Sequence, residues 1–166
     1  MTGPIPKEKE MHRIAVTGII WKEEDGVRKY LITQRAAHKK AWPLKWTVPG
    51  GGMEVDDYIH TEPTYANSES PQWYGAIETT VRREIKEEVG LEVEKPEYLL
   101  DVVFIRPDGV PCVVLSMFCK YKSGDIAYDE DTADHAWITA EEVGKYELIQ
   151  GIDHEIEQVE AILAKR

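Results

Sequence analysis

The chain has 166 residues, a length typical of one domain with a sizeable hydrophobic core. Its 42% hydrophobic and 31% charged residues are ordinary for a globular protein, which excludes a disordered or fibrous class. Twenty basic residues against 31 acidic ones give a net charge of −11, which disfavours binding to a nucleic acid polymer but not to a small phosphorylated ligand. We therefore expect a single domain over residues 1–166, with residues 1–12 as an N-terminal extension.

Hydropathy and cysteine usage indicate a cytoplasmic protein. No run of 18 apolar residues occurs and the N-terminus lacks the apolar core of a secretory signal, so we expect no membrane association. Cys112 and Cys119 lie seven residues apart in one predicted strand, which places them on opposite faces and disfavours a disulfide. No spacing typical of a structural zinc site is present.

The first half of the chain predicts strands. Residues 13–21 and 30–34 are rich in β-branched and aliphatic residues, and the turn-like residues 24–26 between them indicate a hairpin. A third, short strand over residues 46–48 runs into Pro49 and three glycines, whose freedom in φ lets the backbone approach a ligand closely.

The second half combines helices with further strands. Apolar residues at near-helical spacing predict a helix over residues 75–89 that ends at Gly90. Residues 97–105 and 110–121 predict strands joined by a turn at residues 106–109. A strand near Trp137 is followed by Thr139, which predicts a helix N-cap with Glu142 as its capping-box partner, and residues 153–163 predict a final amphipathic helix. This order fits an α+β fold with a mixed sheet.

Three carboxylates in the predicted helix carry the strongest indication of chemistry. Glu84, Glu87 and Glu88 stand at i, i+3 and i+4, which places them on one helical face, close enough to ligate a common cation. Without a cation such a face repels itself, and a solvated helix more often alternates the sign of its charges.

Together with the glycines, this helix resembles the motif of the Nudix hydrolase superfamily, G-x5-E-x7-R-E-U-x-E-E-x-G-U, where U is aliphatic. Gly51 matches the first glycine, and residues 83–91 match from the arginine onward with Arg83, Glu84, Ile85, Glu87, Glu88, Gly90 and Leu91. Outside an insertion and the first dozen residues, the resemblance covers nearly the whole chain. It implies the Nudix α/β/α sandwich.

One position of the motif departs from the family. Eight residues before Arg83, the isolated Glu of the pattern is replaced by Gly75, and 18 extra residues separate this position from Gly51. We assign them to an insertion over residues 56–74. In the family that Glu pairs with the motif arginine, so Arg83 needs another partner, and the sequence leaves Glu54, Glu62 and Glu69 open.

The resemblance implies a divalent-metal-dependent hydrolase that cleaves a diphosphate linkage in a nucleotide or nucleoside diphosphate derivative. Mg²⁺ or Mn²⁺ would be held by Gly51, Glu84, Glu87 and Glu88, because hard cations prefer oxygen ligands. The general base would be Glu84 or, second, Glu130 from the acidic run 129–131, and Arg83 would brace the loop or contact phosphate.

Several features leave alternatives open. Trp42, Trp46, Trp73 and Tyr74 flank the motif and could stack on a base or only pack, and the insertion could close over the site or be a tolerated loop. A non-catalytic nucleotide-binding or regulatory domain is the competing function, and isopentenyl diphosphate isomerase is a weaker one. The expected partner is a small nucleotide-like substrate, and a homodimer is left open.

Overall fold

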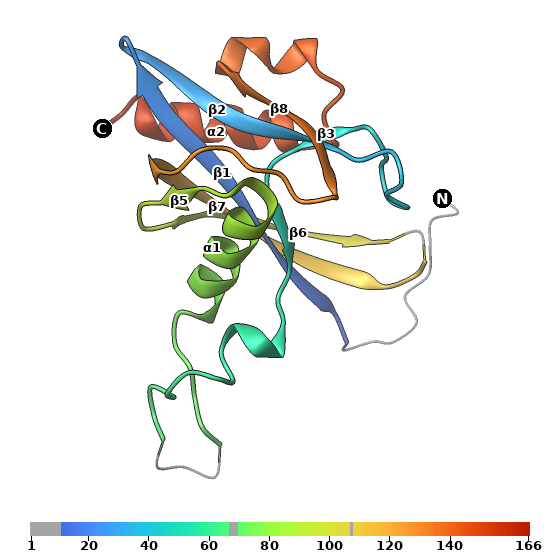
Figure 1. Ribbon diagram of the computed structural model, residues 1–166, viewed down its shortest axis with the longest axis vertical. Coiled ribbons are helices and arrows are strands. Elements are labelled where there is room, and N and C mark those ends of the chain that lie inside the picture. The colour runs from blue at the N-terminus through green and yellow to red at the C-terminus, as the bar shows by residue number, and fades with distance from the viewer. Residues whose placement is uncertain (1–10, 67–69, 107) are drawn as a thin grey trace.

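The computed structural model describes residues 11–66, 70–106 and 108–166, so residues 1–10 of the expected extension and Glu69 lie outside the described residues. The protein is built around a mixed eight-stranded sheet (Figure 1). Strand β1 (Arg13–Glu24) is central, because it runs antiparallel to β2 (Val27–Arg35) and parallel to β7 (Pro111–Ser123).

The remaining strands extend this centre on both sides. β3 (Trp46–Thr47) and β8 (Thr132–Ile138) pair with β2. β4 (Gly50–Gly52) pairs with β1, so that Val16 lies opposite Gly51. β5 (Glu92–Val93) and β6 (Glu97–Ile105) pair antiparallel with β7. The glycine segment is therefore held against the central strand of the sheet.

Two α-helices cover opposite faces of the sheet (Figure 1). Helix α1 (Ala76–Val89) packs with Val16 and Ile20 of β1, whereas α2 (Ile152–Leu163) packs with Ile19 from the same strand. Neighbouring residues of a strand point to opposite faces, so this alternation produces two separate cores. The arrangement confirms the α+β fold and the Nudix-type α/β/α sandwich expected from the resemblance.

Glycines fix where α1 begins, ends and packs. Gly75 and Gly90 cap it with φ of 78° and 75°, a left-handed conformation that glycine adopts without steric cost. At Gly18 an added Cβ would lie 2.7 Å from Cδ1 of Ile85, so the absence of a side chain lets α1 approach β1 closely.

Most predicted elements are confirmed. The first hairpin turns at Asp25 and Gly26, both with positive φ, and the second turns at Gly109, although Pro107 lies outside the described residues. Both cysteines are buried and free, as expected. No helix in the described parts of the chain is long and apolar enough to span a membrane.

The differences concern short or irregular elements. Thr139 is an N-cap as predicted, and its N–H donates to Glu142 Oε2 at 3.1 Å, but it opens the 3₁₀ segment η2 (Ala140–Lys145) and not an α-helix. Strands β4 and β5 and the 3₁₀ turn η1 (Val55–Asp57) were not predicted, because two or three residues carry no measurable periodicity.

Candidate functional site

The site is formed where β4 meets helix α1. A Cβ built on Gly51 would lie 2.4 Å from the carboxylate atoms of Glu84, so only glycine leaves room for that side chain. The N–H of Gly50 donates to Glu88 Oε2 at 2.9 Å, and Nη2 of Arg83 donates to the carbonyl of Gly52 at 3.0 Å. Each of the three glycines of β4 thus contacts one charged residue of the motif helix.

Glu84 is the buried carboxylate of the site. Its Oε1 lies 3.0 Å from Nη2 of Arg83, and its side chain faces Gly51. Burial raises the pKa of Glu84, and the charge of Arg83 only partly opposes this effect. A carboxylate with a raised pKa is better able to accept a proton near neutral pH.

The pKa of Glu88 is shifted more strongly than that of Glu84. Burial raises its pKa to about 8, although the Gly50 N–H stabilises its charged form. The negative charges of Glu84 and Asp129 also contribute to this increase in pKa, whereas the positive charge of Arg35 opposes it. These four charged groups therefore lie in one electrostatic environment.

Glu87 differs from the other two, because it is exposed and forms an ion pair of 2.8 Å with Arg83 Nη1. The three carboxylates share a helix face as predicted, but in this structure they do not converge on one point. Among the described residues no group of three or more His, Cys, Asp or Glu side chains is arranged to hold a metal ion. A cation at this face requires Glu84 and Glu87 to turn from Arg83.

Arg83 is held by an acidic residue that the sequence analysis did not name. Its Nε donates to Oδ1 of Asp57, whose side chain is fully buried. Oδ2 of Asp57 also accepts from the N–H of Glu54 and the hydroxyl of Thr80, both at 2.8 Å. Burial acts to raise the pKa of Asp57, but the bonds from Arg83, Glu54 and Thr80 outweigh it and hold the pKa below its usual value.

This contact corrects the position of the insertion. Asp57 follows Gly51 after five residues, which is the family spacing G-x5-E with Asp in place of Glu. The 18 extra residues therefore lie between Asp57 and Arg83, and Gly75 is the helix cap and not the substitute for the motif acid. The prediction of a carboxylate partner for Arg83 is confirmed, but Glu54 and Glu62 are not that partner. Counting forward from Gly51 identifies it.

In the acidic run 129–131 before β8, one residue contributes to the electrostatics of the site. The charge of Asp129 reaches Glu88, whereas Glu130 is exposed and has no hydrogen bond or ion pair with the described residues. Asp131 forms an ion pair with Lys39 and a hydrogen bond with Nε2 of His38, and so holds the loop after β2. Asp129 is thus a further candidate acid beside Glu130.

The flanking aromatic residues contact one another or the core. Trp46 packs edge-on against Tyr146 in the core beside α2, and Trp42 packs against Phe104. Within the insertion, Trp73 contacts Tyr58, and Tyr74 contacts Tyr65. The described parts of the insertion lie at the end of the molecule opposite α2 (Figure 1).

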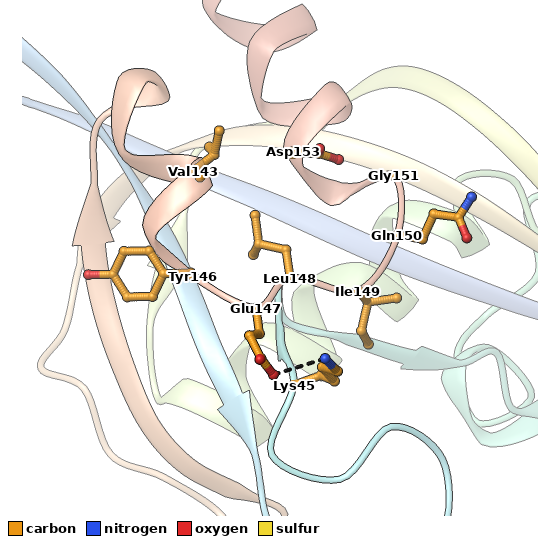
Figure 2. A pocket seen from close by; sticks show the side chains of 10 residues that line it. Lys45, Val143, Tyr146, Glu147, Leu148, Ile149, Gln150, Gly151 and Asp153 are labelled. Carbon is orange, nitrogen blue, oxygen red and sulfur yellow. Dashed lines mark hydrogen bonds and ion pairs between the residues drawn. The ribbon is translucent and has the colours of Figure 1, made fainter.

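A pocket of about 310 Å³ lies between Lys45 and the segment that joins η2 to α2 (Figure 2). Lys45 Nζ pairs with Glu147 at 2.9 Å across it, and Trp46 holds the segment by backbone bonds to Glu147 and Ile149. None of its lining residues belongs to β4 or α1, so the carboxylates and not this pocket locate the chemistry.

Comparison with known proteins identifies the family that shares this geometry. The model of the NUDIX domain matches residues 11–159, which is most of the chain. The chain belongs to the Nudix family. It is therefore a Nudix-type phosphohydrolase.

Individual relatives are distant. The nucleoside triphosphatase NudI of Klebsiella pneumoniae is 28% identical over 129 residues, which cover 72% of this chain and 79% of the relative. The Nudix domain of Shewanella oneidensis NrtR, complexed with ADP ribose, superimposes with a TM-score of 0.70 at 21% identity, over 95% of this chain and 92% of that one. A C. elegans Ap4A hydrolase superimposes with a TM-score of 0.67 at 18% identity, over 93% of this chain and 99% of that one. These structures share the Nudix fold.

The first prediction concerns the buried ion pair between Asp57 and Arg83. Replacing Asp57 with Ala should lower the free energy of unfolding by about 3 kcal/mol, because Arg83 loses its buried partner. Asp57→Glu, which restores the family residue, should cost only about 1 kcal/mol. The neighbouring Asp56→Ala is a matched control, since Asp56 is 78% exposed and should change stability by less than about 0.5 kcal/mol. Urea unfolding measures all three, and equal losses for Asp56 and Asp57 would contradict the assignment.

The second prediction is a pH dependence of the metal-free protein. The pKa of Glu88 rises from 4.5 to about 8 on folding, so between these values the folded state binds more protons than the unfolded state. Stability should therefore fall as the pH rises from about 5 to 8 in the presence of a chelator. Asp57, whose pKa is lowered, affects stability only in more acidic solution. The Glu88→Gln variant should show a weaker dependence of stability on pH, whereas the exposed Glu87→Gln variant should show the same dependence as wild type. A wild-type stability that is constant across this range would refute the prediction.

Proposed function

We propose that the protein is a divalent-metal-dependent hydrolase that cleaves a diphosphate linkage in a nucleotide or nucleoside diphosphate derivative. The observation that carries the proposal is the packing of Glu84 and Glu88 against Gly51 and Gly50 of β4. Two buried carboxylates with raised pKa values, brought together at one strand, form a donor set that a hard cation would stabilise.

The chain supplies suitable ligands for such an ion. Glu84, Glu87 and Glu88 provide carboxylate oxygens, and Gly51 provides a backbone carbonyl on a segment with no side chain in the way. When bound, Mg²⁺ or Mn²⁺ would neutralise the phosphate charge and lower the pKa of a coordinated water. The mutual repulsion of the carboxylates, which Arg83 now relieves by ion pairs, would then be relieved by the cation.

Protein groups would complete the reaction. Glu84 is the first candidate for the general base, because its carboxylate is buried and its pKa is raised. Glu130 and Asp129 are second candidates on the loop before β8, and the charge of Asp129 already reaches the site. Arg83 would be a positioning residue, since Asp57 fixes its guanidinium and Arg83 in turn fixes the Gly52 carbonyl.

Relatives support the substrate class. NudI is a nucleoside triphosphatase, and Nudix neighbours of known structure include an Ap4A hydrolase and a domain complexed with ADP ribose. Each of these ligands is a nucleotide with a di- or polyphosphate. We propose a substrate of this kind, acted on in the cytoplasm. A homodimer stays an open alternative.

A regulatory nucleotide-binding domain is the second candidate function. The structure favours it in one respect, because Glu84 and Glu87 form ion pairs with Arg83 and do not face a common point. A binding domain would keep these ion pairs when nucleotide is bound, whereas a hydrolase would exchange them for metal bonds. Turnover with Mg²⁺ separates the two functions.

The third prediction is metal dependence. Mg²⁺ or Mn²⁺ should raise the melting temperature, as any ligand of the native state does, and should permit release of phosphate or pyrophosphate from a panel of nucleotides. Glu87→Gln and Glu88→Gln should each abolish both effects while the metal-free protein stays folded. Glu92→Gln, an exposed acid on β5, is the control and should retain both. Wild-type turnover that persists after exhaustive chelation would exclude this function.

The fourth prediction concerns the insertion, which we propose shapes substrate access. Replacing residues 58–74 with a short linker retains Asp57 and therefore the support of Arg83. KM or substrate preference should change by a larger factor than the affinity for Mg²⁺, because the metal ligands lie on β4 and α1. An unchanged substrate profile together with lost metal binding would show that the insertion belongs to the metal site.

A further inference from the structure

One edge of the sheet has no partner strand in the described chain. Strand β7 pairs with β1 on one side and with β6 on the other, but β6 pairs with no second strand among the described residues. The backbone N–H and C=O groups of β6 that point away from β7 therefore form an open edge, which can accept a further strand. In Figure 1, β6 and the adjoining ends of β7 and β1 extend beyond both α-helices.

The sequence of β6 lacks most of the features that protect an edge from pairing. Residues 97–105 include no Lys, Arg, Pro or Gly. Both acids of the strand bond within their own chain, because Glu97 accepts two hydrogen bonds from Arg166, at 2.8 and 2.7 Å, and Asp101 accepts one from the Tyr98 hydroxyl at 2.5 Å. A β-bulge near the start of β6 leaves the second half of the strand regular and free to pair.

An apolar row crosses the sheet and ends at this edge. Ile14 of β1 lies opposite Val113 of β7, which in turn lies opposite Val103 of β6, so the three side chains are neighbours on one face. This face also carries α1, because Val16, two residues after Ile14, packs against that helix. The helix does not cover the row, since Ile14 is 42% exposed and Val103 is 58% exposed. The row is therefore accessible to a partner that pairs with β6.

The edge is self-complementary, so it fits a second copy of the chain. Two β6 strands related by a two-fold axis perpendicular to the sheet run antiparallel and keep the same faces in common. Pairing centred on Val103 sets this residue opposite its counterpart, so the apolar rows of the two copies join end to end. Asp101 then lies opposite Ile105 and not opposite a second Asp101. Because Asp101 is the only charged residue from 101 to 105, two chains of net charge −11 meet where they repel little.

We propose that two copies of the protein associate by antiparallel pairing of their β6 strands, centred on Val103. This inference concerns assembly and does not depend on the proposed function. Pairing bonds the outward backbone groups of both strands and removes the joined apolar rows from water. Strand β4 lies on the other side of β1 from β7 and β6, so association leaves the carboxylate site of each copy accessible.

Size-exclusion chromatography with light scattering, performed on the full chain over a range of concentrations, tests this association. Wild type should have the mass of a dimer and should approach the monomer mass on dilution. Val103→Lys sets two ammonium groups opposite each other and should raise the Kd of the dimer by about tenfold or more. Val55→Lys is the matched control, because Val55 is also 58% exposed but lies in η1, and should leave the Kd within about twofold. A wild type that is monomeric at every concentration, or equal losses in the two variants, would overturn the inference.

Cysteine cross-linking keeps the test independent of folding defects. Val103→Cys places thiols on directly opposite residues, whose Cα atoms lie about 4.5–5.5 Å apart in an antiparallel pair, within reach of a disulfide. Oxidation should therefore give a covalent dimer on a non-reducing gel. Val102→Cys is the control, since Val102 points to the other face and would lie opposite Phe104, so it should cross-link far less. The native Cys112 and Cys119 are buried and should not react. Cross-linking of Val102→Cys that matches or exceeds that of Val103→Cys would overturn the proposed pairing.

Discussion

The buried ion pair between Asp57 and Arg83 is the interaction on which the site depends. Asp57 accepts hydrogen bonds from the N–H of Glu54 at the start of η1, and from Thr80 and Arg83 of α1. Arg83 also donates to the Gly52 carbonyl. The pair therefore joins the glycine strand, the turn after it and the motif helix into one unit. Burying the carboxylate is costly, and the hydrogen bonds to it offset that cost. Because these bonds and the bond from Arg83 to Gly52 together link η1, α1 and β4, the relative position of those elements is fixed with them.

That position forces the remaining carboxylates together. Glu84 and Glu88 belong to consecutive turns of α1, and the close approach of β4 removes both from water. The helix tolerates the accumulated negative charge because Arg83 pairs with Glu84 and Glu87, and because the Gly50 N–H bonds to Glu88. Burial raises the pKa of both carboxylates by more than these contacts lower it. Keeping the two carboxylates ionised in this position therefore costs stability.

The insertion interrupts the sequence motif but leaves the contacts between its two halves in place. Eighteen extra residues between Asp57 and Arg83 lengthen a surface loop, and the entropic cost of such lengthening grows only slowly with loop length. The insertion has its own contacts, including the tilted ring contact of Tyr58 with Trp73 and the hydrogen bond from Trp73 Nε1 to the Thr61 carbonyl. The two halves of the motif meet through side chains, so their separation along the chain matters little.

The sequence by itself determined the family, the two α-helices, the longer strands and the acidic helix face, because each depends on local periodicity or fixed spacing. It left the partner of Arg83 ambiguous, because the insertion gives two positions for the motif acid: Gly75 when counted back from Arg83, and Asp57 when counted forward from Gly51. It also could not show that Glu87 faces Arg83 while Glu88 faces Gly50, although both occupy one helix face. Tertiary structure decided these points, because burial, charge pairing and the room left by a glycine depend on which elements the fold brings into contact.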